Sequence, residues 1–565
     1  MSHGYWKDLL NILALETVGE LSNISSNPTF LHAPRMKYTY RNRVKKRGGS
    51  SSSRIEASIL ANARAKEAAS VSRKIRNAQS YERLCSKLAE PKFRALFIAV
   101  ARLFSDQLLK DVDILLQLKS LKPDEDRIAH LKKLSLAGKW APSPGAAHDR
   151  VTNISTAIAE LIYASQSLPS YPSVLKTSIS YSDRAHVLRS FYQRWVLTEL
   201  RRAQCCPEPL MTANRWTEIK YNRVASICMK NNKDHFFKHD PSGFEKYLVD
   251  VESGRKTISG ATLLPHELVA GAMAAESALS SVKSKFPALL ELKKKRAAAE
   301  IRVIESQWKT LISNLRESGS IENAIAICDV SGSMGSMYCK LDKKDVSPIY
   351  PAISLSLVLA SLAKPPFNGG FITFSANPQF VLLDLDKPLS KLVADMVRVD
   401  WEMNTDFSAV FLRLLLPLAV KNKVKPEDMI KRLFVFSDMQ FDSARSDFNG
   451  RASDWETNHD VVEKAYKEAG YEVPQIVYWD LSVKSQMTKE VESSTKKGVA
   501  MMNGFSPAML KVFMGEEDEG SEWEEVNEDG ETATVVERNE DEFNPINVMK
   551  KALMKASFGG LVVVD

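Results

Sequence analysis

Three oxygen-bearing side chains follow an apolar run at even spacing in the segment AIAICDVSGSM, residues 324 to 334. Asp329 directly follows the run, and Ser331 and Ser333 come two and four residues later. Carboxylate and hydroxyl oxygens without sulfur or imidazole are the ligands that Mg²⁺, Mn²⁺ and Ca²⁺ prefer. Gly332, between the serines, and Gly335, just after them, let the loop turn tightly and let a partner approach. The segment therefore predicts a divalent-cation site where a buried strand ends.

Two further oxygen donors stand at other boundaries between predicted elements. Asp438 ends an apolar run in FVFSDMQFD, and Thr405 lies in MNTDF, in the loop that opens a helix predicted from residue 406. Ligands of open parallel sheets bind outside the carboxyl ends of the strands, near the point where the strand order reverses. We expect Mg²⁺, with Mn²⁺ or Ca²⁺ as alternatives, and an open coordination position that attracts an acidic group of a protein partner. The five expected metal ligands are Asp329, Ser331, Ser333, Thr405 and Asp438.

A purely structural alternative exists for the same residues. Asp and Ser are favoured at helix N-caps and in turns, because their side chains accept hydrogen bonds from nearby backbone N–H groups. Under this alternative, Asp329 and the serines cap the helix predicted near residue 348 or shape the turn after the strand, and hold no ion.

The hydrophobic pattern after about residue 320 predicts the strands and helices that could position these residues. Short β-rich runs alternate there with helical stretches, which predicts a mostly parallel sheet covered on both faces. The run at 378–385 follows its predecessor too closely for a helical crossover, so we expect an antiparallel edge strand. The other predicted strands are 324–328, 369–376, 432–438, 475–481 and 499–505. The predicted helices are 348–363, 387–398, 406–420, 457–469 and 506–514.

The first part of the chain has a different period. Apolar residues recur at spacings of three and four, most clearly in residues 92–118 and 184–203, which predicts helices. No repeat of fixed period occurs, so the expected module is irregular and solenoid-like. The fold class is therefore α plus α/β, with an α-helical module over 1–318 and a doubly wound α/β domain over 319–565. Residues 516–542 are predicted to be a disordered acidic insertion in that domain.

Charge is divided unevenly along the chain. The net charge of +8 combines +21 over residues 1–320 with −13 over residues 516–542 and small contributions elsewhere. Clustered Lys and Arg favour nucleic-acid phosphates, whereas basic residues on helices are also often only solvated. The sequence RNRVKKRGGSSSSR, residues 41–54, predicts an exposed flexible loop. The nucleic-acid-binding candidates are Arg41, Arg43, Lys45, Lys46, Arg47, Lys293, Lys294, Lys295 and Arg296.

Several other functional classes find little support in the sequence. The six cysteines form no C-x-x-C pair, so neither a disulfide framework nor a structural zinc is indicated. GSMGSM lacks the Lys and Ser/Thr of a phosphate-binding loop. We predict no catalytic residues, no enzymatic activity and no small-molecule substrate. No apolar stretch reaches membrane-spanning length and no signal peptide is evident, so we expect an intracellular protein, cytoplasmic or nuclear, without a membrane partner.

The segment of residues 321–514 resembles a von Willebrand factor A-type domain. Such domains carry a metal-ion-dependent adhesion site built from D-x-S-x-S, a Thr and a later Asp, and the resemblance assigns these ligand roles to the five residues named above. It implies that the ion completes its shell with a carboxylate of the partner.

Three stretches of the sequence point to a more specific family: residues 216–269, residues 318–334 and the final NPINVMKKALMKASFGGLVVVD. They are similar to an uncharacterised family of plants, fungi and large viruses, domain of unknown function 2828. Its architecture resembles that of the Ro ribonucleoprotein autoantigen, a TROVE-like helical module before an A-type domain. This implies a binding scaffold for an acidic partner and RNA. Family members have a longer helical region before HGYWKDLLNIL, so a truncated gene model or a degraded paralogue is an alternative, as is a protein–protein adaptor without an RNA role.

Overall fold

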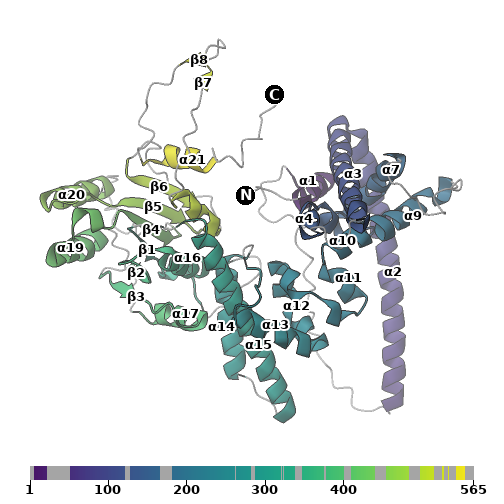
Figure 1. The fold of residues 1–565 in the computed structure, drawn as a ribbon, viewed down its shortest axis with the longest axis horizontal. Coiled ribbons are helices and arrows are strands. Elements are labelled where there is room, and N and C mark those ends of the chain that lie inside the picture. The colour runs from purple at the N-terminus through teal and green to yellow at the C-terminus, as the bar shows by residue number, and fades with distance from the viewer. Residues whose placement is uncertain are drawn as a thin grey trace. The chain divides into compact units, whose positions relative to one another are not determined.

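The computed structural model describes residues 6–21, 51–120, 127–165, 181–260, 263–281, 287–319, 321, 323–337, 346–374, 377–399, 409–438, 454–482, 497–514, 525–526, 532–533 and 543–553. These residues form two compact units that divide between Ile219 and Lys220 (Figure 1). Helices make up the first unit, and the second combines helices with a sheet. None of the described helices is long and apolar enough to cross a membrane.

The first unit packs around one long amphipathic helix, α3. Its buried residues Phe93, Val100, Phe104 and Leu108 recur at helical spacing and therefore share a face, which contacts α1, α2 and α7. The described elements of this unit are α1 (Trp6–Val18), α2 (Ser51–Ala89), α3 (Pro91–Ser120), α4 (Arg127–Lys132), α5 (Ala137–Trp140), α6 (Ala147–Thr152), α7 (Ile154–Ser165), α9 (Tyr181–Phe191), the π-helix η1 (Tyr192–Leu197), α10 (Thr198–Ala203), α11 (Pro207–Thr212) and the 3-10 turn η2 (Trp216–Glu218).

A six-stranded sheet forms the centre of the second unit, with the strand order β3-β2-β1-β4-β5-β6. All neighbouring pairs are parallel except β2 and β3, which are antiparallel. The strands are β1 (Ala324–Cys328), β2 (Gly370–Thr373), β3 (Phe380–Leu382), β4 (Arg432–Ser437), β5 (Gln475–Asp480) and β6 (Val499–Asn503). The prediction of a mostly parallel sheet with an antiparallel edge strand is confirmed.

Helices cover both faces of this sheet (Figure 1). Alternate residues of β1 divide between two cores: Ala324, Ala326 and Cys328 join one, and Ile325 and Ile327 join the other. Strands buried on both faces are continuously apolar for this reason. The first core includes α16 (Ile349–Leu362), α17 (Leu389–Arg398), η7 (Pro507–Val512) and α21 (Pro545–Leu553). The second includes η5 (Val410–Leu415), α19 (Leu416–Asn422) and α20 (Asp454–Glu468).

Four helices that precede the sheet in the chain belong to the second unit. Two of them pack directly on the sheet's helices: α14 (Pro265–Ser281) contacts α16 and α17, and α15 (Pro287–Arg316) contacts α16. The others are α12 (Ser226–His239) and α13 (Pro241–Glu252). The second unit also contains the 3-10 turns η3 (Tyr221–Arg223), η4 (Gly332–Met334) and η6 (Pro426–Asp428). The expected boundary near residue 318 thus marks the change of secondary structure, whereas the compact units divide before α12.

Local departures from the predicted elements occur in several segments. Helix α2 begins at Ser51, so residues 51–54 are helical and not part of the predicted loop. The segment predicted as a helix at 506–514 is the 3-10 helix η7, and the one at 406–420 contains the π-helical turn η5. Residues 516–542 lie outside the described residues apart from β7 (Glu525–Val526) and β8 (Thr532–Ala533), which pair as an antiparallel ladder.

One buried histidine makes the second unit sensitive to acid. His266, at the start of α14, is 4% exposed and packs edge-on against Phe505 with ring centroids 5.3 Å apart. Burial lowers its pKa to about 4, with a smaller lowering from Lys230 and an opposing effect from Glu267. Its ordinary pKa is 6.5, so between pH 6.5 and 4 the unfolded chain binds a proton that the folded chain does not.

We therefore expect the free energy of unfolding to fall as the pH drops through this window, with His266 contributing about 2 kcal/mol of the loss at pH 4.5. Urea unfolding at pH 7 and at pH 4.5 measures this loss of stability. The free energy of unfolding of His266→Leu should differ less between the two pH values than that of wild type. His186→Leu, at an exposed position, is the control. An equal pH dependence for His266→Leu and wild type would contradict the assignment.

Candidate metal centre

The ends of β1 and β4 meet at the point where the strand order reverses. These two strands are parallel neighbours, with β2 and β3 on one side of the pair and β5 and β6 on the other. The ladder continues past β1, because the Asp329 N–H donates to the carbonyl of Phe436 at 3.1 Å. Asp329 and Asp438 therefore end adjacent strands at the same edge of the sheet, where the outgoing chains diverge and leave room for a ligand.

Asp329 is held rigidly at this edge. Its side chain is buried, and Oδ1 accepts a hydrogen bond from the backbone N–H of Ser331 at 2.8 Å. Its Oδ2 accepts a hydrogen bond from the Ser437 hydroxyl at 2.6 Å. Because a carboxylate offers about four lone-pair positions, these two bonds orient the group and leave it able to bind a cation.

Three oxygen-bearing side chains, those of Ser331, Ser333 and Asp438, form a row that connects the loop after Asp329 with the end of β4, and we call this row the oxygen chain. The Ser331 Oγ and Ser333 Oγ atoms lie 3.0 Å apart, and the Ser333 hydroxyl donates to Asp438 Oδ1 at 3.3 Å. Asp438 is only 6% exposed, whereas Ser333, on the 3-10 turn η4, is exposed. The site therefore has buried carboxylates and a hydroxyl rim that a partner can reach.

The spacing of these oxygens fits a small divalent cation. Ligands at adjacent corners of an octahedron with bonds of about 2.1 Å lie about 3.0 Å apart, close to the two distances in the oxygen chain. In the part of the chain that the structure describes, no three His, Cys, Asp or Glu side chains gather in a way that could hold a metal ion. The candidate centre is defined by the carboxylates of Asp329 and Asp438 and two serine hydroxyls, and such oxygen donors suit Mg²⁺ better than Zn²⁺.

Four of the five predicted ligands are thus brought together: Asp329, Ser331, Ser333 and Asp438. Thr405 lies in residues 400–408, outside the described residues. The alternative of a helix cap does not apply to α16, whose N-cap position is Pro348 and receives no side-chain hydrogen bond. The alternative of a turn applies in part, because Asp329 does accept the Ser331 N–H bond that shapes the loop.

Ser437 is a component of the site that the sequence analysis did not identify. Its hydroxyl orients Asp329 from the adjacent strand, and such outer contacts fix the geometry of metal ligands. The sequence did contain one indication of this role, because Ser437 stands immediately before Asp438 at the end of a predicted strand. Cys328, immediately before Asp329, has no comparable role, because burial raises the pKa of its thiol to about 12 and keeps it protonated.

A second strand end repeats the same local pattern. Asp480 ends β5 and is buried, and its Oδ1 accepts a hydrogen bond from the Ser482 N–H at 2.8 Å, as Asp329 does from Ser331. Its Oδ2 accepts a hydrogen bond from Asn503 Nδ2 at 3.2 Å. Asp480 can therefore be compared with Asp329. Both are buried aspartates that accept a turn hydrogen bond at the end of a strand, but Asp480 has the Asn503 amide beside it where Asp329 has the serine hydroxyls and Asp438.

The predicted basic candidates are only partly available for a ligand. Arg41, Arg43, Lys45, Lys46 and Arg47 lie outside the described residues. Lys293, Lys294, Lys295 and Arg296 are all exposed on α15.

Two of the four α15 charges have partners within the chain. Lys295 pairs with Glu291 at 3.0 Å, and Arg296 forms a two-point ion pair with Asp234 in which its Nε lies 2.9 Å from Oδ1. Lys293 and Lys294 form no ion pair with the described residues. The α15 run is therefore a weaker candidate for phosphate binding than its composition indicated.

Two family models match the chain. Residues 1–321 match a domain of unknown function, DUF2828, and residues 323–553 match another, DUF7788. A relative in Acanthamoeba polyphaga mimivirus, the uncharacterised protein L728, is 27% identical over 430 residues. The match spans 74% of this chain and 63% of the relative, so less than two thirds of that relative's length is represented.

Proposed function

This chain belongs to the DUF2828 family, and from that premise we propose that it is a non-enzymatic binding scaffold whose α/β part holds a divalent cation and, through it, an acidic group of a protein partner. The observation that carries the proposal is the oxygen chain from Ser331 through Ser333 to Asp438, with buried Asp329 beside it.

The architecture supports the finer proposal that residues from about 319 form a von Willebrand factor A-type domain. A parallel sheet with helices on both faces positions a D-x-S-x-S loop at the end of the first strand. Under this proposal the helical part before it is a TROVE-like module. The helical content and the family match support that half of the proposal.

In the proposed site, Asp329 and Asp438 provide the negative charge, and the hydroxyls of Ser331, Ser333 and Thr405 provide neutral donors. A bound Mg²⁺ supplies a positive charge with a strong preference for oxygen. Five protein donors leave one of six octahedral positions for a carboxylate of the partner. Because Ser333 is exposed and the aspartates are buried, the partner approaches from the serine side.

A second proposed activity, nucleic-acid binding by the helical part, has one specific observation in its favour. The exposed helix α2 carries Arg64, Lys66, Arg73, Lys74, Arg76 and Arg83, none of which forms an ion pair with the described residues. Unpaired surface cations are available for phosphates, whereas paired ones are not. The competing function is a protein–protein adaptor without an RNA role, and a degraded paralogue would have neither activity.

The cation site is tested with Mn²⁺ as the probe. We expect the full-length chain to take up one Mn²⁺ below about 1 mM, seen as loss of the free-ion electron paramagnetic resonance signal and reversed by Mg²⁺. Affinity capture in Mg²⁺ and in EDTA is the second measurement, in which an acidic partner should be released by EDTA. No Mn²⁺ uptake would overturn the cation site, and Mn²⁺ uptake without any EDTA-sensitive partner would overturn the binding role.

A further inference from the structure

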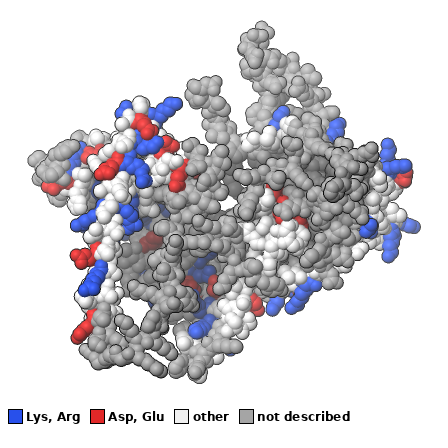
Figure 2. Space-filling view, turned by 180° about the vertical axis from the view of Figure 1, so that it is seen from behind, with Lys and Arg blue, Asp and Glu red and all other residues white. Residues whose placement is uncertain are grey.

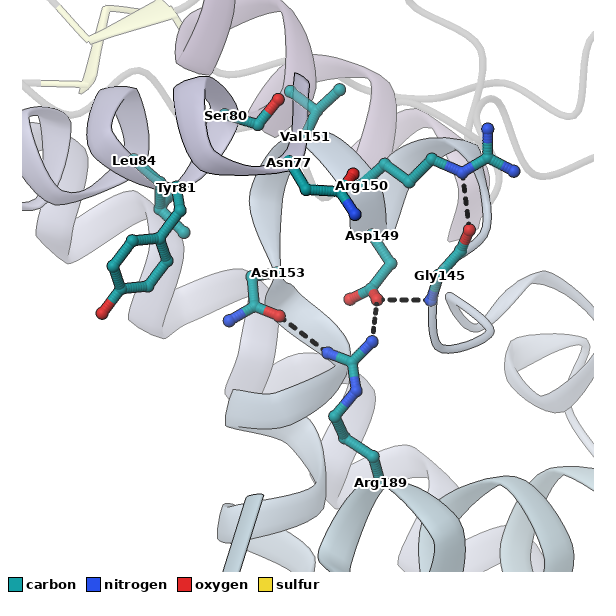
Figure 3. A pocket seen from close by; sticks show the side chains of 10 residues that line it. All are labelled: Asn77, Ser80, Tyr81, Leu84, Gly145, Asp149, Arg150, Val151, Asn153 and Arg189. Atoms are coloured by element: carbon teal, nitrogen blue, oxygen red, sulfur yellow. Dashed lines mark hydrogen bonds and ion pairs between the residues drawn. The ribbon is translucent and has the colours of Figure 1, made fainter. Parts of the chain in front are cut away.

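A small pocket lined by both polar and apolar side chains lies in the first unit among α2, α6 and α9 (Figure 3). Its volume is about 250 Å³, below the roughly 300–1,000 Å³ of pockets that enclose drug-sized ligands. Asn77, Ser80 and Tyr81 of α2 line one side. The pocket is therefore sized for a single base or phosphate group.

An ion pair between the partly exposed Arg189 and the buried Asp149 forms the opposite wall. Arg189 of α9 donates to Asp149 Oδ2 at 2.7 Å and to Asn153 Oδ1 at 2.7 Å, as Figure 3 shows. Asp149 also accepts hydrogen bonds from the backbone N–H groups of Gly145 and Ser155. Because the charges of this pair offset each other, the wall is rigid and neutral, and the hydrogen-bonding capacity of the Asp149 carboxylate is largely used within the protein.

Arg150 supplies the net charge of the pocket. Its Nε donates to the carbonyl of Gly145 at 2.7 Å, which fixes the guanidinium without neutralising it. No other residue lining the pocket offsets this charge, since Asp149 is paired with Arg189. The amide of Asn77 and the hydroxyl of Ser80 add neutral hydrogen-bonding groups. A pocket with one guanidinium that no carboxylate neutralises favours an anionic ligand.

The same face of α2 continues away from the pocket as a row of cations. Arg73 and Arg76 lie four residues before Asn77 and Ser80, so each sits one turn along the same face. Lys66 lies seven residues before Arg73, two turns further along. All three are exposed, and Figure 2 shows basic side chains recurring along this helix with acidic ones between them. The row from Lys66 to Asn77 spans about 16 Å.

We propose that this pocket and the α2 row of Lys66, Arg73 and Arg76 form a binding site for single-stranded nucleic acid, a proposal that rests on the nucleic-acid function proposed above and gives it a location. The pocket takes the base or the phosphate of one nucleotide, and the groups that can contact it there are Arg150 and the ring of Tyr81, which is 62% exposed at the rim. Neighbouring phosphates contact the row. A pocket for one base requires an unstacked strand, which a duplex does not offer.

Fluorescence anisotropy with a labelled 20-nucleotide oligouridylate tests the proposal. The double variant Arg73→Ala/Arg76→Ala should bind at least tenfold more weakly at 0.1 M salt, and the slope of log affinity against log salt should fall by about 1.4, the value for two lost phosphate contacts on a single strand. Tyr81→Ala should bind at least fivefold more weakly with an unchanged salt slope, and Tyr81→Phe should restore binding.

Lys132→Ala/Lys133→Ala is the matched control, because it removes two exposed cations at the end of α4, another helix of the same unit, and should change neither affinity nor slope by more than twofold. The deoxy oligomer of equivalent sequence distinguishes DNA from RNA as the source of the phosphates. Circular dichroism verifies the helix content of each variant.

Failure of the location and failure of the function give different results. If wild type does not bind any oligonucleotide, both proposals fall and the adaptor function is favoured. If wild type binds and the α2 variants bind equally well, nucleic-acid binding stands and this site is wrong. Equal affinity for a 20-base-pair duplex, or tighter binding of a phosphopeptide than of the oligonucleotide, would overturn the single-strand assignment.

Discussion

The Asp329→Asn variant is expected to bind Mn²⁺ at least about a hundredfold more weakly than the wild-type chain. Asparagine has nearly the same shape and its amide oxygen can still accept the Ser331 N–H bond, so the loop should keep its conformation. What is lost is a full negative charge at a buried position, where charge interactions are least screened. Mn²⁺ titration followed by electron paramagnetic resonance measures the change.

Asp480→Asn is the matched control for this variant. Asp480 is buried, ends a neighbouring strand and accepts the same type of turn bond from Ser482, but it has Asn503 beside it in place of the oxygen chain. Because its charge lies one strand further from the proposed centre, this variant should lose less than about tenfold in Mn²⁺ affinity, against the loss of about a hundredfold expected for Asp329→Asn. Equal loss of Mn²⁺ affinity in both variants would mean that the effect arises from general damage to the sheet edge, and unchanged affinity in Asp329→Asn would eliminate the proposed centre.

The second large effect is expected from Trp479→Ala. Trp479 is fully buried on β5, packs against Phe436 with ring centroids 5.4 Å apart, and donates from Nε1 to the carbonyl of Gly504 at 2.7 Å. Truncation removes the largest buried side chain of the sheet and leaves that carbonyl without this donor, at a cost of about 3–5 kcal/mol. Because β5 pairs with β4, the loss should extend to the strand that directly precedes Asp438.

Hydrogen exchange suits this test because it reports free energies of opening for each segment of a chain with two units. Protection of the amides in residues 432–437 and 475–480 should fall at least about a hundredfold, since 1.4 kcal/mol corresponds to a factor of ten. Trp195→Ala, at a tryptophan that is 55% exposed on η1, should leave both segments unchanged. A loss below tenfold in Trp479→Ala would show that the sheet core tolerates the cavity.

The sequence by itself determined the order and type of the elements in the α/β part. Strand β1 matches its predicted residues, and the edge strand was recognised because two β-rich runs stood too close for a crossover helix. Such patterns are visible because strands buried on both faces are uninterrupted apolar runs. The same pattern placed Asp329 and Asp438 at strand ends, so the expectation of one shared edge followed from chain topology.

Only the tertiary structure decided which side chains meet and which charges remain available. The Ser437 bond to Asp329 joins residues 108 positions apart, and the pairing of Arg296 with Asp234 depends on how α12 and α15 pack. The assignment of α14 and α15 to the sheet's unit likewise depends on contacts between distant segments. Local periodicity carries information about one element's exposed and buried faces, whereas the partner of each face is fixed by packing among elements that are far apart in sequence.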